Sequence, residues 1–282
     1  MGKFRYNKVA IAGMGFMGGS LGKQLISSRL AKNVTGLGRS MPRLRAAKRM
    51  KAATDITTDI AEAVSGADIV VLCVPVMLIP GMFASILPFL DKKTVVTDMG
   101  SVKESVEKEI KKIDRNKQFC GSHPMVGSEK TGIKNLKPAL YKGGACIITG
   151  GKSKRTSKVT GFWKALGMKI IKMTAAGHDR AVSGVSHFPH LLSFAMVNLN
   201  PDLIKNNPDL IGRGFKDATR IAASGEEIWS DIFIANKNRV IDDIKQAREE
   251  LLELKKMIAF NRVKNLKGYI KKARSLREGL SK

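Results

Sequence analysis

Three glycines directly after a short apolar segment constrain the fold of this chain more than any other feature. Residues 8–12 (KVAIA) have the continuous hydrophobicity of a buried strand, and a helix is expected from Gly18 to Arg29. Between them lies the turn GMGFMG, in which Gly13 permits a tight bend, Gly15 lets a pyrophosphate approach the backbone, and Gly18 allows close helix packing. The free amides at the helix start favour negative charge. The turn therefore predicts a dinucleotide site that includes Gly13, Gly15, Phe16, Met17 and Gly18.

Short apolar runs alternate with helical patterns over the first two thirds of the sequence. Further strands are expected at residues 33–37, 68–74, 94–97, 119–122, 145–149 and 168–173. Continuous apolar strands separated by helices are typical of an α/β fold, a Rossmann-type doubly wound parallel sheet covered on both faces. After Thr174 helical periodicity dominates. We therefore expect a dinucleotide-binding domain over residues 1–174 and an all-helical C-terminal domain over residues 175–282.

The second strand ends in Gly38-Arg39-Ser40. Enzymes that use NAD usually carry an Asp or Glu at this position for the ribose 2′-hydroxyl. A missing carboxylate, together with a cation and a hydroxyl, suits a 2′-phosphate, so the turn favours NADP over NAD, with Arg39 and Ser40 as cofactor contacts. The alternative is that Arg39 only covers the adenine, which NAD enzymes also allow.

Two polar residues follow predicted strands, whose carboxyl ends border the ligand crevice of a doubly wound sheet. Ser101 ends the segment DMGS and is a candidate for the site, although a helix N-cap is an equally good interpretation. His123 lies in GSHP, between turn-forming residues. An imidazole with an unperturbed pKa of about 6.5 at this place suits general acid–base catalysis.

The beginning of the helical part carries three more candidates. His187 and His190 would share one face of a helix, and without a suitably spaced carboxylate we expect them to face the site as polar groups and not to bind a metal. Arg220 stands in an otherwise apolar helical segment, so we expect it to be buried with an anionic partner. That partner is either a structural carboxylate or the carboxylate of a substrate, bound bidentately.

The net charge of +26 raises the question of nucleic-acid binding. The basic residues are spread over the whole chain, and their concentration in residues 262–282 comes without a recognised nucleic-acid-binding signature, so a small anionic substrate is the favoured partner. Cys73, Cys120 and Cys146 are too far apart for a disulfide framework or a zinc site. Since we find neither a signal peptide nor an apolar run of about 18 residues, we expect a cytoplasmic protein without a membrane span.

An ordered set of motifs covers the chain from Val9 to about Asn236 and resembles the prephenate/arogenate dehydrogenase family. The motifs are GxGxxGGS, CVP, DMGSVK, GSHPMVGSE, HDR, SHFPH and FKDATRIAAS. The resemblance implies a Rossmann domain followed by a helical domain that binds substrate and forms a homodimer. It also implies NAD(P)-dependent oxidative decarboxylation of prephenate to 4-hydroxyphenylpyruvate, a step of tyrosine biosynthesis.

Carried over by position, the resemblance also implies residue roles. His123 is the base at the ring hydroxyl, and Ser101 orients it near the nicotinamide. Arg220 binds a substrate carboxylate, and His190, with the neighbouring His187, belongs to the substrate pocket. Val74 and Pro75 of the CVP motif belong to the cofactor site.

Three alternatives stay open at this point. Arogenate differs from prephenate only in an amine in place of a ketone on the side chain. Other dehydrogenases with the same two-part plan act on hydroxy acids or imines and usually depend on a Lys, and His123 and Arg220 argue against them. A basic nucleic-acid-binding protein that uses residues 262–282 is the competing hypothesis from another class.

Overall fold

The computed structural model describes residues 4–127 and 132–280. Packing divides the chain into two compact units, Met1–Asn236 and Lys237–Lys282, each of which is described by itself. The change from strands to helices comes earlier, between the last strand, which ends at Lys172, and a helix that begins at Ala175. The predicted boundary at residues 174/175 lies at this change in secondary structure, whereas the division by packing lies at Asn236.

Five parallel strands form the central sheet, in the order β3-β2-β1-β4-β5. The strands are β1 (Tyr6–Ala12), β2 (Ala31–Leu37), β3 (Asp55–Thr57), β4 (Ile69–Leu72) and β5 (Val95–Asp98). This order matches the first five strands of the Rossmann order 3-2-1-4-5-6, which confirms the predicted fold class. The pleat of β1 sends Val9 and Ile11 into one core and Ala10 and Ala12 into another, so the sheet is buried on both faces.

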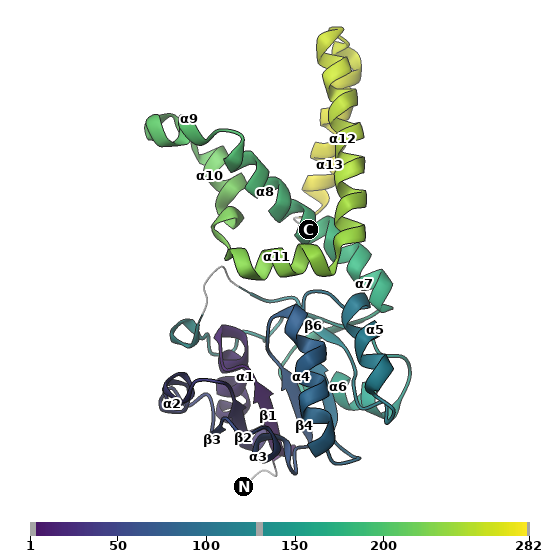
Figure 1. Ribbon diagram of the computed structural model, residues 1–282. Coiled ribbons are helices and arrows are strands. Elements are labelled where there is room, and N and C mark those ends of the chain that lie inside the picture. The colour runs from purple at the N-terminus through teal and green to yellow at the C-terminus, as the bar shows by residue number, and fades with distance from the viewer. Residues whose placement is uncertain (1–3, 128–131, 281–282) are drawn as a thin grey trace. The chain divides into compact units, whose positions relative to one another are not determined.

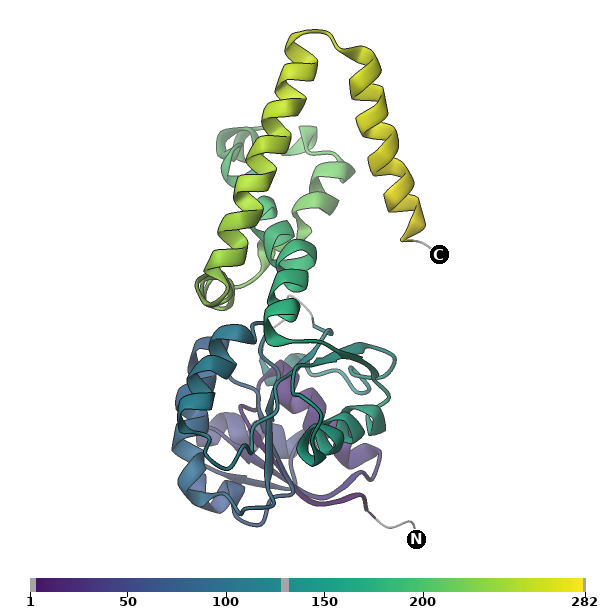
Figure 2. The ribbon, with the colours of Figure 1, turned by 90° about the vertical axis from the view of Figure 1, so that its right-hand side faces the viewer.

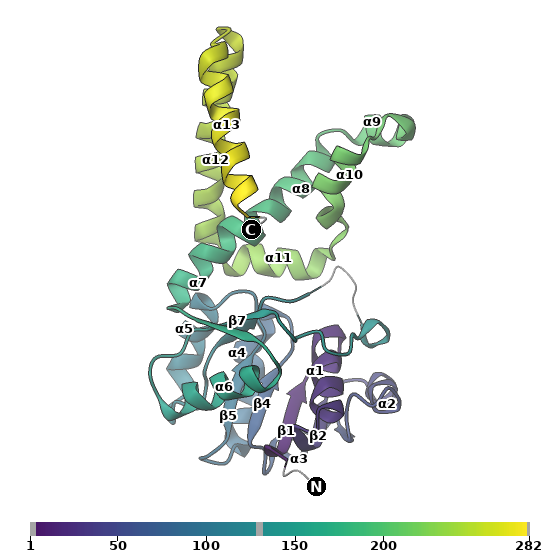
Figure 3. The same ribbon diagram turned by 180° about the vertical axis from the view of Figure 1, so that it is seen from behind.

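Helices cover both faces of this sheet. Figure 1 shows α4 across the near face, and the view from behind in Figure 3 shows α1 and α6 on the other. Leu21, Leu25 and Trp163 pack in the core behind the sheet, and Phe83 and Val106 pack in the core in front. The helices are α1 (Phe16–Ser27), α2 (Met41–Arg49), α3 (Ile60–Val64), α4 (Ile79–Ile86), α5 (Glu104–Ile113) and α6 (Lys154–Ala165).

A second sheet of three strands corrects the expectation of one continuous parallel sheet. Its order is β6-β7-β8, and β6 is antiparallel to β7. The strands are β6 (Ser122–Pro124), β7 (Ala145–Ile148) and β8 (Lys169–Lys172). Of the predicted strand at 119–122, Phe119 makes a single parallel bridge to Val96. The regular strand begins only at Ser122, the first residue that pairs with β7, opposite Ile148. The N–H and the hydroxyl of Ser122 donate hydrogen bonds to Asp98 at the end of β5.

The first unit ends in helices, and in the described part of the chain no strand follows β8, which confirms the predicted all-helical C-terminal part. These helices are α7 (Ala175–Val182), α8 (Phe188–Asn198), α9 (Pro201–Asn206), α10 (Arg213–Thr219) and α11 (Glu226–Ala235). A π-helical turn, Ser183–His187, joins α7 to α8. Such turns are often found at functional sites, and this one carries His187 at its end.

The second unit consists of α12 (Lys237–Ala259) and α13 (Val263–Gly279), which Figure 2 shows as two long helices joined by a short turn. Large apolar side chains are exposed along both helices, among them Ile241, Leu251 and Ile258 on α12 and Ile270 and Leu276 on α13. Within the described residues, no helix is both long enough and apolar enough to cross a bilayer.

Candidate active site

The glycine turn between β1 and α1 has the geometry that its sequence predicts. Gly13 has a φ of +102°, and a Cβ there would collide with the carbonyl oxygen of Cys73. A Cβ on Gly18 would collide with the carbonyl oxygen of Gly13, whereas a Cβ on Gly15 would meet only open space. Gly15 is also the N-cap of α1 and leaves the first amides of this helix without a side-chain cap. An open backbone surface at a helix N-terminus fits a pyrophosphate.

A cavity of about 610 Å³ lies in front of this turn, within the first unit. It is lined by the carboxyl ends of the strands and by residues of the helical segment. The predicted cofactor residues Gly15, Phe16, Met17, Gly18, Val74 and Pro75 all line it, together with Ser101, His123, His187 and His190. The structure therefore brings most of the predicted site residues to one place. Among the described lining residues none is Lys or Arg, and Asp231 is the charged one.

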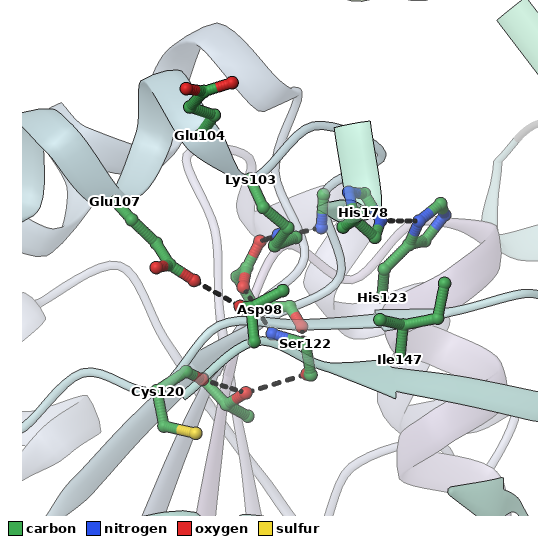
Figure 4. A network of polar contacts seen from close by, with 12 residues as sticks. Asp98, Lys103, Glu104, Glu107, Cys120, Ser122, His123, Ile147 and His178 are labelled. Carbon is green, nitrogen blue, oxygen red and sulfur yellow. Dashed lines mark hydrogen bonds and ion pairs between the residues drawn. The ribbon is translucent and has the colours of Figure 1, made fainter. Parts of the chain in front are cut away.

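His123 occupies the middle of the short strand β6, opposite Ile147 of β7. Its Nδ1 lies 2.8 Å from Nε2 of His178, as Figure 4 shows. Burial is the main cause that lowers the pKa of His123 well below its ordinary value, and the neighbouring His178 and Lys103 act in the same direction. A low pKa keeps the imidazole neutral at physiological pH, as a proton acceptor must be.

Asp179 joins His178 to the beginning of α5. Its Oδ1 accepts hydrogen bonds from the backbone N–H of Lys103 at 2.8 Å and from Nδ1 of His178 at 2.7 Å. Its Oδ2 accepts one from the N–H of Glu104 at 2.8 Å. A carboxylate from α7 therefore satisfies the free amides at the N-terminus of α5. The N-cap interpretation of Ser101 is accordingly wrong, because α5 begins at Glu104 and its cap is supplied from elsewhere in the chain.

A buried ion pair supports the loop that carries Ser101. Asp98, at the end of β5, pairs with Lys103, and both side chains are fully buried (Figure 4). The carboxylate of Asp98 also accepts hydrogen bonds from the N–H of Gly100 at 2.9 Å and from the N–H of Ser122 at 3.0 Å. One acidic side chain thereby fixes both the loop before α5 and the strand that holds His123.

The two other histidines of the cavity differ in their partners. His187 is 1% exposed, and its Nδ1 lies 3.1 Å from Nδ2 of Asn236. Its Nε2 has no hydrogen-bond partner in the described structure. Nδ1 of His190 donates to the carbonyl of Ser186 at 2.9 Å. The His190 ring stacks on Trp229, with 3.5 Å between the ring centroids.

The structure corrects the expectation of a buried Arg220. The residue is exposed and begins a 3₁₀ turn after α10, a helix without buried residues. The segment is therefore not a core helix, and Arg220 is not among the described lining residues. It does lie near the cavity, because its charge is one cause that lowers the pKa of His190, after burial.

The structure also places the remaining predicted residues. Arg39 is exposed, Ser40 precedes α2, and neither is among the described residues that line the cavity. Both follow β2, whose Leu37 carbonyl accepts a hydrogen bond from the N–H of Gly13 at 2.9 Å. The segment Gly38-Arg39-Ser40, which is predicted to distinguish NADP from NAD, thus lies beside the glycine turn. The end of the GSHPMVGSE motif, Ser128 and Glu129, lies outside the described residues.

Sequence reasoning assigned no role to His178, Asp179, Asn236 or Trp229. The adjacent pair His178-Asp179 was visible as the HD of the HDR motif, but nothing in its spacing from His123 shows that the side chains meet. Trp229 is one of two tryptophans in the chain, and its contact with His190 also depends on folding. None of the described His, Cys, Asp and Glu side chains forms a group of three that could hold a metal ion.

A Rossmann sheet, an open glycine turn and a neutral histidine in the cavity before it define a nicotinamide-dependent dehydrogenase. Comparisons with known proteins give the particular family. The family model described as the nucleotide-binding domain of prephenate dehydrogenase matches residues 21–172, and the one described as its dimerization domain matches residues 174–272. The chain belongs to the prephenate dehydrogenase family and is an oxidoreductase, which confirms the resemblance of its motifs.

Several relatives match over nearly the whole chain. The prephenate dehydrogenase of Bacillus subtilis is 28% identical over 96% of this chain and 76% of its own length. The cyclohexadienyl dehydrogenase of Zymomonas mobilis is 28% identical over 90% of this chain and 89% of its own. Among solved structures, the prephenate dehydrogenase of Aquifex aeolicus, in complex with hydroxyphenyl propionate and NAD⁺, superposes with a TM-score of 0.90 at 31% identity, over 97% and 98% of the two chains.

Proposed function

We propose that this enzyme converts prephenate to 4-hydroxyphenylpyruvate, with His123 as the base. The observation that carries the proposal is the place of His123, neutral and partly buried in the cavity that begins at the glycine turn. The Aquifex relative that superposes on this chain was solved with hydroxyphenyl propionate, a ligand with the same kind of ring as the expected product. Prephenate is a dianion, and the net charge of +26 would steer it to the protein.

His123 acts on the hydroxyl of the cyclohexadienyl ring. A bound oxidised nicotinamide would supply the acceptor for the hydride that leaves the carbon carrying this hydroxyl. His123 takes up the hydroxyl proton as the carbon–oxygen bond gains double-bond character. The bond to the ring carboxylate then breaks, carbon dioxide leaves, and the electron pair makes the ring aromatic. The protonated His123 can return its proton to the oxygen, so the base is regenerated.

The other site residues bind and orient in this proposal. Ser101, His187 and His190 line the cavity and offer polar groups to the ligands. Arg220 would attract a substrate carboxylate from beside His190. In the described part of the chain no hydrogen bond joins the Ser101 side chain to His123, whose Nδ1 is held by His178. We therefore place Ser101 at the ligands, and we assign the orientation of His123 to His178.

For the cofactor we propose NADP over NAD, because Gly38-Arg39-Ser40 offers a cation and a hydroxyl and lacks a carboxylate. The test is the double substitution Gly38→Asp with Arg39→Gln, which should reverse the preference. A Cβ on Gly38 would lie 3.2 Å from Cδ2 of the buried Leu44, so the substitution requires this side chain to move by a few tenths of an ångström. A wild-type enzyme that already prefers NAD tenfold would refute this part of the proposal.

Arogenate is the second candidate substrate, and one observation favours it. Asp231 lines the cavity, and a carboxylate there suits the ammonium group that arogenate has and prephenate lacks. Asp231→Asn should lower kcat/KM for arogenate selectively if arogenate is the substrate. Equal effects on both substrates would remove Asp231 as the group that distinguishes them.

We further propose a homodimer formed through the helical residues 175–282, with residues 1–174 as the cofactor domain. The support is the family description of a dimerization domain over residues 174–272 and the exposed apolar side chains of α12 and α13. Light scattering would measure the oligomeric state. A cytoplasmic location stays a prediction from the three unpaired cysteines.

The experiment that tests the proposed activity follows cofactor reduction with prephenate and arogenate, each with NAD and NADP. We expect turnover of prephenate with at least one cofactor. His123→Asn keeps a polar side chain but cannot accept the proton, so kcat should fall by about 10²–10⁴ with KM within a few-fold. The acid limb of the wild-type kcat profile should lie below the ordinary pKa of histidine and should vanish in the variant. Near-normal turnover of His123→Asn would exclude His123 as the base.

A further inference from the structure

A chain of three side chains, Asp179, His178 and His123, leads from the N-terminus of α5 to the cavity. The contacts are 2.7 Å between Asp179 Oδ1 and His178 Nδ1, and 2.8 Å between His178 Nε2 and His123 Nδ1. His178 and Asp179 are almost completely buried, and neither is among the described residues that line the cavity. His123 is therefore the member of this chain of contacts that reaches the cavity.

The partners of Asp179 determine which nitrogen of His178 carries a proton. A carboxylate is only an acceptor, and here it faces two backbone N–H groups as well as Nδ1 of His178. Nδ1 of His178 must therefore carry its hydrogen. In a neutral His178 this leaves Nε2 with a lone pair, and the neighbouring nitrogen of His123 must then be the donor.

We propose that Asp179 and His178 are positioning residues that fix His123 as the Nδ1–H tautomer, with Nε2 as its proton-accepting atom. This inference rests on the proposed function. Nε2 of His123 is the atom that accepts the proton, and its lone pair is free because His178 holds the hydrogen on Nδ1. Without such a partner, the neutral imidazole of His123 could place its hydrogen on Nε2, which is then a donor and cannot act as the base. An Asp that selects the tautomer of a catalytic His has the same effect in the Ser-His-Asp triad, but here a second imidazole stands between them.

The same segment gives His187 the opposite tautomer. Nδ2 of Asn236 donates to the Asp179 carbonyl at 3.0 Å and lies 3.1 Å from Nδ1 of His187. An amide nitrogen is only a donor, so Nδ1 of His187 is an acceptor and its hydrogen is on Nε2. The two histidines thus carry their hydrogens on different ring nitrogens. His187 provides an internal reference for the test.

The first arm of the test is a long-range ¹H–¹⁵N NMR spectrum recorded at neutral pH, which distinguishes the two tautomers of each imidazole. Only the signals of four histidines have to be assigned. We expect His123 as Nδ1–H and His187 as Nε2–H. In His178→Leu, which cannot accept a hydrogen bond, His123 should change wholly or partly to Nε2–H. His178→Gln, whose amide oxygen can accept this bond, should restore the Nδ1–H form.

The second arm is kinetic. His178→Leu should lower kcat by about 10- to 100-fold, within what a positioned base contributes, with little change in KM for the cofactor. His178→Gln should recover part of this loss. Ala181→Ser, an exposed position of the same helix, is the control for nonspecific effects on α7.

Two results would overturn the inference. One is a wild-type His123 with its hydrogen on Nε2, and the other is a His178→Leu enzyme with unchanged tautomer and unchanged kcat. Failure of the proposed function looks different. The wild type would then reduce neither cofactor with either substrate, while the tautomers in the NMR spectrum would still be as expected.

Discussion

The buried His187 should make the stability of this protein depend on pH. Burial lowers the pKa of His187 from 6.5 to about 4, and the nearby His178 and His190 act in the same direction. The Asp179 carboxylate opposes the shift, as does the Ser101 backbone, which lies near the ring but outside hydrogen-bonding geometry. Because the folded pKa is below the unfolded one, acid protonates the unfolded chain first. Stability is therefore fully present above pH 6.5 and falls as the pH decreases towards 4.

The magnitude follows from the two pKa values. A histidine that titrates at about 4 in the folded protein and at 6.5 in the unfolded chain reduces the free energy of unfolding by about 2 kcal/mol between pH 7.5 and pH 5. The assay is urea unfolding of the wild type and of His187→Gln, whose side chain does not titrate, at several values of pH. The two proteins can differ in stability at pH 7.5, since only the slope with pH is compared.

We expect the wild type to lose about 2 kcal/mol more than His187→Gln over this range. NMR titration of the His187 ring supplies an independent measurement and should show a neutral ring at pH 5. Equal slopes in the two proteins, or a ring that titrates near 6.5 in the folded state, would show that burial does not hold His187 neutral.

Three further predictions concern the ion pair, the glycine turn and the substrate carboxylate. Lys103→Met leaves the buried Asp98 without its cation and should lower the free energy of unfolding by about 3–5 kcal/mol; adding Asp98→Asn should recover part of this, and an unchanged urea midpoint would contradict the argument. Gly13→Ala should weaken cofactor binding at least about tenfold in a fluorescence titration, because φ is +102° and the Cβ meets the Cys73 carbonyl; wild-type affinity would show that the turn adapts. Arg220→Ala should raise KM for the substrate about tenfold or more with little change in cofactor affinity; a protein that unfolds without selective loss of substrate affinity would identify a structural ion pair.

Much of the cofactor half was predictable because its signals are local. The strand, the glycine turn and the helix within residues 8–29 are each specified by residues that are neighbours in the sequence. The turn has the conformation that these residues predict. The apolar runs marked four of the five strands of the central sheet to within a few residues, and only the short strand β3 was not predicted. The family motifs then identified His123, His187 and His190, all of which line the cavity.

The predictions failed where a residue's surroundings come from distant parts of the chain. Arg220 has the sequence neighbours of a core helix, yet α10 buries none of its residues in this unit. Ser101 is a residue type that commonly caps helices, but the first amides of α5 donate their hydrogen bonds to Asp179. Of the strand expected at residues 119–122, Phe119 makes a single bridge to β5, and regular pairing begins only at Ser122, with β7.

The sequence by itself determined the class of fold, the glycine turn and the family, because periodicity, turn chemistry and ordered motifs are properties of neighbouring residues. Only the tertiary structure decided how His123 is held. Its partner His178 lies 55 residues away, and Asp179 reaches the amide of Lys103 across 76 residues. These contacts exist because α7 packs beside α5, and hydrogen bonds of about 2.8 Å demand a precision that no spacing in a sequence specifies.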